Sequence, residues 1–232
     1  MERGSSRLID APARRSTAPS PLQGAGIANF DHAGVRVATL DETAAIRDAH
    51  AWAVHDNPIY DASFSADDRE LFLLQGAQSR TTELQRVDAL TAAPLGAPRV
   101  VFTGPVGEQP GVLATHDGRH VVTLVGGQVA LRDARTLAAL WTLDDTAIEH
   151  MALSPDDRSL LLAGTDGSLH FVDVASGADQ RVHRPRAIVQ VAFSPDGRTA
   201  ATAEADKRVL LWDVARRAVR DTFTATSPAS PC

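Results

Sequence analysis

Residues 191–215, VAFSPDGRTAATAEADKRVLLWDVA, contain two short apolar strands around a turn at Lys207-Arg208, and a Ser-Pro-Asp-Gly turn accompanies them. The stretch from Met151, MALSPDDRSLLLAGTDGSLHFVDVA, has the same turn, the same apolar run and the same closing pair of an aliphatic residue and Asp. Looser copies begin at Leu113 and Ala62. This sequence pattern is therefore repeated along the chain, and the repeat predicts the fold.

The closing pairs give the period of the repeat. They are Leu40-Asp41, Val87-Asp88, Arg132-Asp133, Val172-Asp173 and Trp212-Asp213. A period of about 40 to 45 residues with short alternating strands is typical of the blades of a β-propeller. We therefore predict an all-β fold, a propeller or part of one, with about five blades.

Each repeat predicts one four-stranded antiparallel sheet. In the last repeat, residues 188–193 form a nearly continuous apolar strand, which fits an innermost strand covered on both faces. Ser194-Pro195-Asp196-Gly197 then reverses the chain, because these residue types favour a tight turn. Strands at 199–203 and 209–212 follow, and an exposed outer strand at 218–223 ends the blade.

The chain divides into a repeat region and two tails. Residues 1–23 are rich in Arg, Ser, Pro and Ala without apolar periodicity and are expected to be disordered, and residues 224–232 are expected to fray. The repeats span about 24–50, 51–97, 98–143, 144–183 and 184–223. The first repeat offers three strands, at 27–30, 35–40 and 44–50, and no apolar inner strand before Gly24. We expect the first blade to be incomplete.

Composition excludes several classes of function. A formal net charge of -6 gives no attraction to a phosphate backbone or to anionic lipid, so we expect no nucleic acid and no membrane as partner. No apolar run approaches the length of a membrane helix or of a signal-peptide core. The single cysteine, Cys232, has no internal disulfide partner. We expect a soluble cytoplasmic protein.

The stretches VAFSPDGR and LLWDV resemble the WD40-repeat family, in the degenerate form of bacterial repeats. The family commonly ties each blade with a Gly-His pair, a strand Ser or Thr, a turn Asp and a Trp, and Thr202, Asp206 and Trp212 match the last three. His183 lies one residue from the expected spacing, and His55 stands at the right distance before Phe64.

Other repeats depart from this pattern. Val87, Arg132 and Val172 replace the Trp. A rival resemblance is to bacterial lactonase-like repeats of 40 residues, which share SPDGR without the Trp. The residues expected to build the blades are Phe64, Phe193, Thr202, Asp206, Trp212 and Asp213, and Trp141 is expected to pack between blades.

No catalytic, cofactor-binding or metal-binding residue is predicted. His116 and His120 flank a hairpin turn and do not lie on one face of a helix, so their spacing of four residues does not indicate a zinc site. Asp67-Asp68 and Asp156-Asp157 lie in the recurring turn, where a turn role explains them. The glycine-rich stretch 104–111 lacks the Lys-Ser/Thr of a phosphate loop.

The resemblance implies a non-catalytic scaffold for protein-protein contact, and the chain is not expected to be an enzyme. The alternative is a propeller enzyme of hydrolase or lactonase type, which requires polar residues at the central channel. The starts of the inner strands read Ile59, Val112, Ile148 and Ile188, which favours an inert channel.

The resemblance also bears on the ring. Such propellers have about seven blades, so we expect the chain to be the C-terminal repeat portion of a larger signalling or regulatory protein, or an array completed by another chain or by self-association. A closed five-bladed ring is the structural alternative.

Polar residues gather at one end of the predicted blades. The connections into the inner strands and the turns between second and third strands emerge at the same end of an antiparallel sheet. We predict that this end binds a protein partner through Trp52, His55, Asn57, Asp166, His183, Arg184, Arg186 and Lys207. The SPDGR turns, with Arg198, face the opposite end.

Overall fold

The computed structural model describes the backbone of residues 7–10, 26–31, 34–40, 46–52, 58–77 and 80–224, and the side chains of 58–77 and 80–224. The chain divides into two compact units. Unit 1 comprises Met1–Gly126 and Ala130–Leu140, and unit 2 comprises Gly127–Val129 and Trp141–Cys232.

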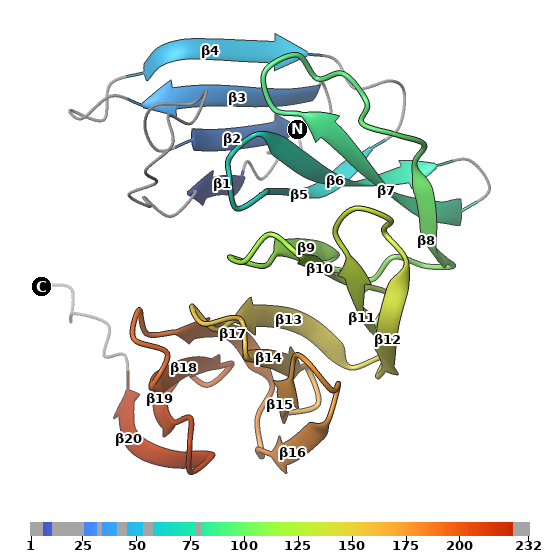
Figure 1. The fold of residues 1–232 in the computed structure, drawn as a ribbon. Helices are drawn as coiled ribbons and strands as arrows, with labels where there is room; N and C mark the ends of the chain where they lie inside the picture. The colour runs from blue at the N-terminus through green and yellow to red at the C-terminus, as the bar shows by residue number, and fades with distance from the viewer. Residues whose placement is uncertain are drawn as a thin grey trace, which may run out of the picture. The chain divides into compact units, whose positions relative to one another are not determined.

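The described strands form five antiparallel sheets of four strands each, called blades 1 to 5 below (Figure 1). Blade 1 contains β1 (Arg7–Asp10), β2 (Gly26–Asp31), β3 (Gly34–Leu40) and β4 (Ile46–Trp52). Blade 2 contains β5 (Ile59–Phe64), β6 (Glu70–Ala77), β7 (Thr81–Asp88) and β8 (Arg99–Thr103). Blade 3 contains β9 (Gly111–Ala114), β10 (His120–Val125), β11 (Gln128–Asp133) and β12 (Ala139–Asp144).

Blade 4 contains β13 (Ile148–Leu153), β14 (Ser159–Gly164), β15 (Ser168–Asp173) and β16 (Asp179–His183). Blade 5 contains β17 (Ile188–Phe193), β18 (Thr199–Glu204), β19 (Arg208–Asp213) and β20 (Ala218–Thr224). In every blade the strands pair in chain order, as in a meander. The predicted all-β class and the four-stranded blades are confirmed.

Blade 1 has one strand more than the sequence predicted. The added strand, β1, lies within the stretch 1–23 that we expected to be a disordered tail, and its Leu8 and Ile9 pair with Asn29 and Ala28 of β2. Four residues are too short for a periodic pattern, so only the backbone pairing identifies this strand. Trp52, expected in a connection, ends β4, and His55 and Asn57 lie outside the described residues.

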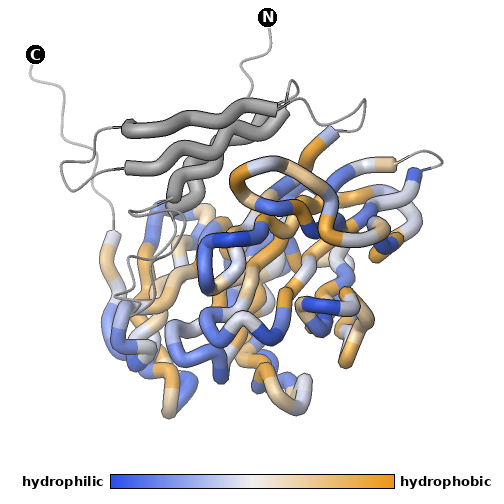
Figure 2. The backbone as a smooth tube through the Cα atoms, turned by 45° about the horizontal axis from the view of Figure 1, so that its top comes forward, coloured by the Kyte–Doolittle hydropathy of each residue, from blue (hydrophilic) through white to orange (hydrophobic). Residues whose placement is uncertain are grey.

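Burial follows the position of a strand within its blade. In β14 every residue from Leu160 to Gly164 is buried, whereas in β20 every residue is exposed. Figure 2 shows how hydrophobic and hydrophilic residues alternate along the described chain. Apolar character on both faces suits a strand between two neighbouring sheets, and a charged outer strand suits an edge.

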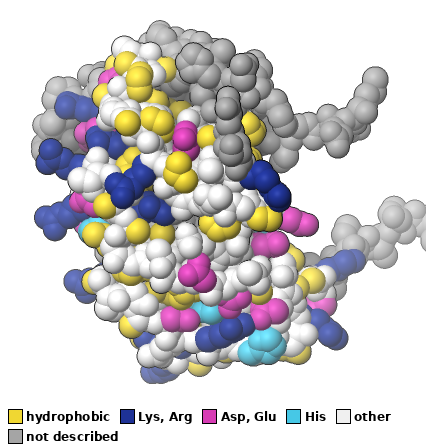
Figure 3. Space-filling view, turned by 90° about the vertical axis from the view of Figure 1, so that its right-hand side faces the viewer, with side chains coloured by type: hydrophobic (Ala, Val, Ile, Leu, Met, Phe, Trp, Pro, Cys, Tyr) yellow, Lys and Arg dark blue, Asp and Glu magenta, His cyan; other side chains and the backbone are white. Residues whose placement is uncertain are grey.

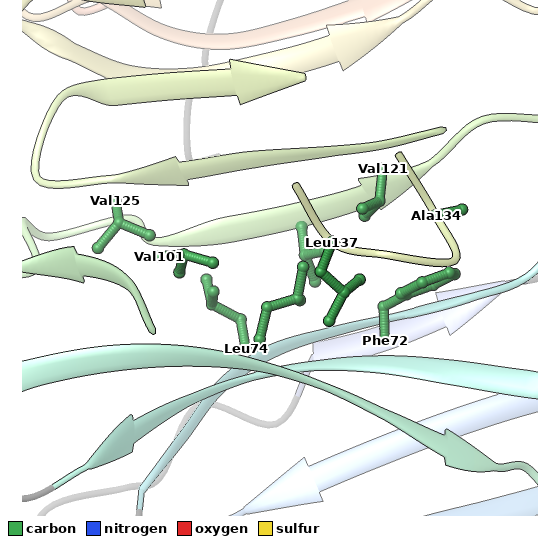
Figure 4. Close-up of a cluster of buried hydrophobic side chains, with 9 residues drawn as sticks. Phe72, Leu74, Val101, Val121, Val125, Ala134 and Leu137 are labelled. Carbon is green, nitrogen blue, oxygen red and sulfur yellow. The ribbon is translucent and has the colours of Figure 1, made fainter. Parts of the chain in front are cut away.

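The core of unit 1 lies between blades 2 and 3 (Figure 4). It contains Phe72, Leu74, Leu84, Val101, Val112, Val121, Val125, Ala134 and Leu137. Two side chains of β5 also bond to the backbone of β9. The Asp61 carboxylate accepts the Val112 N–H at 2.8 Å, and the Ser63 hydroxyl accepts the Ala114 N–H at 2.9 Å. These bonds fix the register between the two inner strands.

The core of unit 2 lies between blades 4 and 5. It contains Leu161, Ala163, Leu169, Phe171, Ile188, Val191, Ala200, Leu210 and Trp212, with Phe193 packed against them. The Trp212 ring meets the edge of Phe171 with a centroid distance of 5.9 Å, and its Nε1 donates to the Thr202 hydroxyl at 3.0 Å. The predicted packing of Phe193 and Trp212 is confirmed, and Phe64 is likewise buried.

Trp141 joins neighbouring blades, as predicted. From β12 its Nε1 donates to the Val174 carbonyl at 2.9 Å, and its ring lies over Gly177 in the turn after β15.

Two kinds of Asp-centred turn repeat along the chain. In the first, a Ser or Thr hydroxyl donates to the Asp two residues later, as in Ser65–Asp67, Thr115–Asp117, Ser154–Asp156 and Ser194–Asp196. In the second, Asp88, Asp133, Asp173 and Asp213 each accept a backbone N–H from three residues ahead. The turn role predicted for Asp67 and Asp156 is confirmed, and Asp213, which we predicted as a blade residue, lies in a turn of the second kind.

Candidate interaction surface

One end of each of blades 2 to 5 is closed by a backbone hydrogen bond between two segments that are distant in the sequence. The turn between the second and third strands, or in blade 2 the end of β6, bonds to the connection that leads into the first strand, through Gly76–Pro58, Gly126–Val106, Thr165–Ala147 and Ala205–Ala187. We call this end the connection rim, and the opposite end, with the Ser/Thr-x-Asp turns, the turn rim. The predicted grouping of the two kinds of loop is confirmed in blades 2 to 5.

In blade 4 the connection rim carries an ion-pair network. Arg181 pairs with Asp145 at 3.0 Å and with Asp166 at 2.7 Å. Burial opposes the ionisation of Asp166, but hydrogen bonds from Ser168 and the charges of Arg181 and His183 hold its pKa below the usual range. Asp166 is exposed and is engaged by Arg181 and by the Ser168 N–H at 2.8 Å.

Beneath this network lies a buried histidine. The His170 side chain is only 3% exposed, and its Nδ1 lies 2.7 Å from Asp179 Oδ2. Its Nε2 lies 3.7 Å from Asp145 Oδ2, a distance too long for a hydrogen bond. His170 is thus bonded to the outer strand of the blade, and its Nε2 lies near Asp145 without a hydrogen bond.

In blade 5 the connection rim rests on a buried carboxylate. The Glu204 side chain is 0% exposed, and it pairs with Arg184 Nε at 3.1 Å and with an Arg208 nitrogen at 3.0 Å. Arg184 also lies over the Trp212 ring, 6.0 Å from its centroid, within range of a cation–π contact. Arg184 therefore packs on the Trp212 ring and neutralises the Glu204 carboxylate, so most of its guanidinium points into the blade.

Arg186 and Lys207 are the accessible cations of this rim. The Arg186 side chain is 61% exposed and lies 3.7 Å from Asp206, a loose pair. Lys207 is exposed and has a positive φ of 69°. Asp206 instead bonds Arg208 Nε at 2.9 Å.

The predicted blade-tying residues are only partly connected. Thr202 and Trp212 bond to each other, as the family pattern implies. Asp206 bonds Arg208, and the exposed His183, at the end of β16, acts electrostatically on Asp166 of its own blade, blade 4. The last blade thus keeps the Thr202–Trp212 part of the family's tie and has an Arg184–Glu204–Arg208 cluster beside it.

Sequence reasoning missed the buried polar residues that support the rim. Asp61, His170 and Glu204 are buried, yet each stands within an apolar strand. A polar residue in an otherwise apolar strand was the available signal, because a buried polar group needs a partner nearby. The partner comes from a neighbouring strand, another blade or a loop, so the pairing is not visible in the local sequence.

Several kinds of site are not found among the described residues. Residues 58–77 and 80–224 contain no group of three or more His, Cys, Asp or Glu that could hold a metal ion. The described part of the chain also contains no helix that is long and apolar enough to cross a membrane. On the face shown in Figure 3, acidic, basic and hydrophobic side chains are interspersed.

Comparisons with known proteins agree with the blade pattern. Residues 174–213 match the family described as WD domain, G-beta repeat. WD repeat-containing protein 1-B of Xenopus laevis and WD repeat-containing protein 1 of Xenopus tropicalis are each 30% identical to this chain over 112 residues. Each match covers 46% of this chain and 18% of the relative. The predicted resemblance to the WD40 family is confirmed, and these relatives are eukaryotic, whereas we expected bacterial repeats.

Proposed function

We propose that this chain, whose residues 174–213 match the WD domain, is a non-catalytic scaffold that holds a partner protein on the connection rim of blades 4 and 5. WD40 repeats generally mediate protein-protein contact, and fold alone does not name a partner. The chain spans less than a fifth of the relatives it matches. We further propose that it works as the repeat portion of a larger regulatory assembly.

One observation supports the location of this binding surface. The connection rim holds charged, exposed side chains on loops that are tied together by backbone bonds, such as Arg184 N–H to Gly167 O at 2.7 Å. Loops fixed in this way lose little entropy when a partner binds. They therefore suit a binding surface better than free loops do.

The charges indicate the chemistry of the partner. Arg186 and Lys207 project from blade 5, and Arg186 has only a loose pair to compensate it. Exposed Arg side chains are frequent anchors in interfaces, where carboxylates bind their planar fork. We propose that an acidic segment of the partner contacts this part of the rim.

The test compares the two rims. The partner is first captured from the source cell and purified, and its affinity is then measured for the parent chain and for single variants. Arg186→Ala and Lys207→Gln should each weaken binding by about 5-fold or more, because each removes an accessible cation. Arg198→Ala is the matched control, since Arg198 is an exposed arginine on the turn rim.

The same measurement can contradict the proposal. An equal loss of affinity in Arg198→Ala, or unchanged affinity in both connection-rim variants, would show that the partner binds elsewhere. Arg184→Ala is not used for this purpose, because Arg184 pairs with the buried Glu204 and its loss changes the blade itself.

A further inference from the structure

Strand β15 of blade 4 holds a histidine whose two ring nitrogens have different surroundings. Nδ1 of His170 lies 2.7 Å from Asp179 Oδ2, and this hydrogen bond places a proton on Nδ1, because an ionised carboxylate only accepts. In the neutral ring Nε2 then carries the lone pair. The His170 side chain is only 3% exposed, and Nε2 is a buried atom without a hydrogen-bond partner. Such an atom is costly and calls for an explanation.

The group that faces Nε2 of His170 is a second carboxylate. Asp145 Oδ2 lies 3.7 Å from Nε2. A lone pair and a carboxylate oxygen repel each other unless a positive centre lies between them. Asp145 comes from the connection after β12, whereas His170 and Asp179 come from β15 and β16, so three segments of unit 2 meet at this point.

The separation of 3.7 Å between Nε2 and Oδ2 distinguishes three kinds of bridge. A proton shared directly between the two atoms holds them about 2.7 to 3.2 Å apart. A water molecule with two hydrogen bonds of about 2.8 Å at a near-tetrahedral angle holds them about 4.5 Å apart. A tetrahedral zinc ion bonded to both at about 2.1 Å holds them about 3.4 Å apart. The observed separation is nearest to the value for a metal ion.

Both facing atoms are supported as metal ligands usually are. A histidine that binds a metal through one nitrogen ordinarily donates its other N–H to a carboxylate or carbonyl, and Asp179 accepts that N–H from His170. The Asp145 carboxylate is held by its other oxygen, since Oδ1 accepts the Ala147 N–H at 3.0 Å and Oδ2 is left toward His170. The two atoms are therefore oriented before a ligand arrives.

The charges around this point suit a divalent cation. Three carboxylates lie in one network, those of Asp145, Asp166 and Asp179. Arg181 pairs with the first two of them, so three negative charges and one positive charge leave a net charge of -2 when the histidines are neutral. A doubly charged ion would compensate this charge.

We propose that His170 Nε2 and Asp145 Oδ2 bind a divalent transition-metal ion such as zinc, with Asp179 orienting the imidazole and water completing the coordination. An imidazole together with a carboxylate suits zinc and neighbouring metals, whereas calcium and magnesium are bound by oxygen ligands. Two protein ligands are fewer than in catalytic or structural zinc sites, and the described residues contain no group of three. Binding should therefore be reversible and weaker than in those sites.

Arg181 controls entry to this site. Its Nη1 lies 3.0 Å from Asp145 Oδ2, the oxygen that binds the metal in this proposal, and its side chain is 44% exposed. A guanidinium at this distance repels a metal ion, so Arg181 must turn toward solvent when the ion binds. Removal of the Arg181 charge should therefore strengthen metal binding.

The test is zinc binding to the untagged full chain, measured by isothermal titration calorimetry at about pH 7.5 over about 1 µM to 1 mM zinc. His170→Gln and Asp145→Asn should each weaken binding by about 10-fold or more, because each removes one of two ligands. Arg181→Gln should strengthen it by about 3-fold or more. Circular dichroism identifies a variant that fails to fold, and Asp145→Asn, which keeps the Oδ1 acceptor, decides if His170→Gln is lost.

A second measurement reports on this site alone, because the Cys232 thiol and other histidines of the chain also bind zinc. In ¹⁵N NMR spectra, zinc should move the Nε2 resonance of His170 while Nδ1 keeps its proton. An Nε2 resonance that zinc does not move, or a parent chain that binds no zinc up to about 1 mM, would overturn the proposal.

His183→Gln is the matched control. His183 is an exposed histidine at the end of β16 in the same blade, and it is not a ligand in the proposed site. Its substitution should change zinc affinity by less than about 2-fold. An equal loss in His183→Gln and His170→Gln would assign the zinc to surface histidines. Weaker binding in Arg181→Gln would place the ion away from Asp145 Oδ2, and either result would overturn the proposal.

The outcome is independent of partner binding at the connection rim. Arg186→Ala should leave zinc affinity unchanged, because Arg186 lies in the blade 5 part of the rim and pairs with Asp206. Failure of rim binding and failure of zinc binding are therefore separate results.

Discussion

Arg132 donates from Nε to the Thr123 hydroxyl at 3.2 Å, and so takes the place that Trp212 has beside Thr202 two repeats later, where Nε1 donates at 3.0 Å. Two chemically different side chains thus satisfy the same strand threonine. Arg132 is only 5% exposed, and its other nitrogens donate to the carbonyls of Leu137 and Val101 at 3.3 Å. Desolvation lowers its pKa, and the charge of Arg99 adds to the effect.

This geometry predicts that Arg132→Lys is not a conservative change. A single ammonium on a flexible stem cannot reach three acceptors that a planar guanidinium bonds from three separate nitrogens. Leaving buried acceptors without donors costs about 1 to 3 kcal/mol each, so we expect the free energy of unfolding to fall by about 2 to 4 kcal/mol. Urea unfolding followed by circular dichroism measures it.

Arg135→Lys is the control for that experiment. Arg135 lies three residues along the chain in an exposed turn, and the same substitution there should change stability by less than about 0.5 kcal/mol. If Arg132→Lys also leaves the free energy of unfolding unchanged, the three hydrogen bonds do not hold blade 3 against β8.

Two substitutions of Trp212 distinguish the contributions of packing and of hydrogen bonding to the stability of blade 5. Trp212→Ala removes a side chain that is 1% exposed and in edge contact with Phe171, and it should cost about 3 to 5 kcal/mol. Trp212→Phe keeps most of the apolar volume but leaves the buried Thr202 hydroxyl without its donor, which should cost about 1 to 3 kcal/mol. Thermal unfolding of both variants should therefore rank them in this order. A neutral Trp212→Ala would show that β19 does not pack against blade 4.

Much of the fold could be predicted because propeller blades are local. Each blade pairs strands in chain order, so the alternation within one repeat contains most of the information about its sheet. β4 ends at Trp52, two residues beyond the end that we predicted at His50. β1 was missed because Leu8 and Ile9 form no periodic pattern of their own.

The connection rim could be predicted only in part. Asp166, His183, Arg186 and Lys207 are exposed on the expected end of their blades, and their role in binding stays a prediction. Arg184 looked the same as Arg186 in sequence, yet it is drawn inward by Glu204, which lies 20 residues away on β18. Charge pairing across strands depends on register, and a single sequence does not show which charge will find a buried partner.

Gly167 tests the rigidity of the connection rim. Its φ is +86°, and a Cβ would overlap the Arg184 carbonyl, so Gly167→Ala must move the loop that carries Arg184 and Arg186. We expect a loss of about 2 to 4 kcal/mol, from left-handed backbone strain together with the clash.

Gly197→Ala is the matched control for this clash. Gly197 also has a positive φ, of 69°, but a Cβ there meets Pro155 Cδ at 3.6 Å, an ordinary contact. It should lose only the backbone cost of about 1 kcal/mol. Thermal unfolding measures the stability of both variants. Equal losses of stability would mean that the close approach of the loop to Gly167 contributes nothing to stability.

The Asp-centred turns predict how stability depends on pH. The hydroxyl of Ser154 donates to Asp156 at 2.6 Å and holds the pKa of that carboxyl below its ordinary value of 3.8, and Ser194 does the same for Asp196. Backbone N–H donors likewise hold down the pKa of Asp88, Asp133 and Asp213. A carboxyl with a depressed folded pKa contributes stability that is fully present above its unfolded pKa and is lost as pH falls through the folded one. We therefore expect the unfolding temperature to be level from neutral pH to about 5 and to fall steadily below about 4.

Asp156→Asn removes the ionisable group from one of these turns. It should lower stability at pH 7 and flatten the decline below pH 4, and calorimetry at stepped pH values measures both effects. A decline below pH 4 as steep in Asp156→Asn as in the parent chain would rule out this turn as a source of the acid sensitivity.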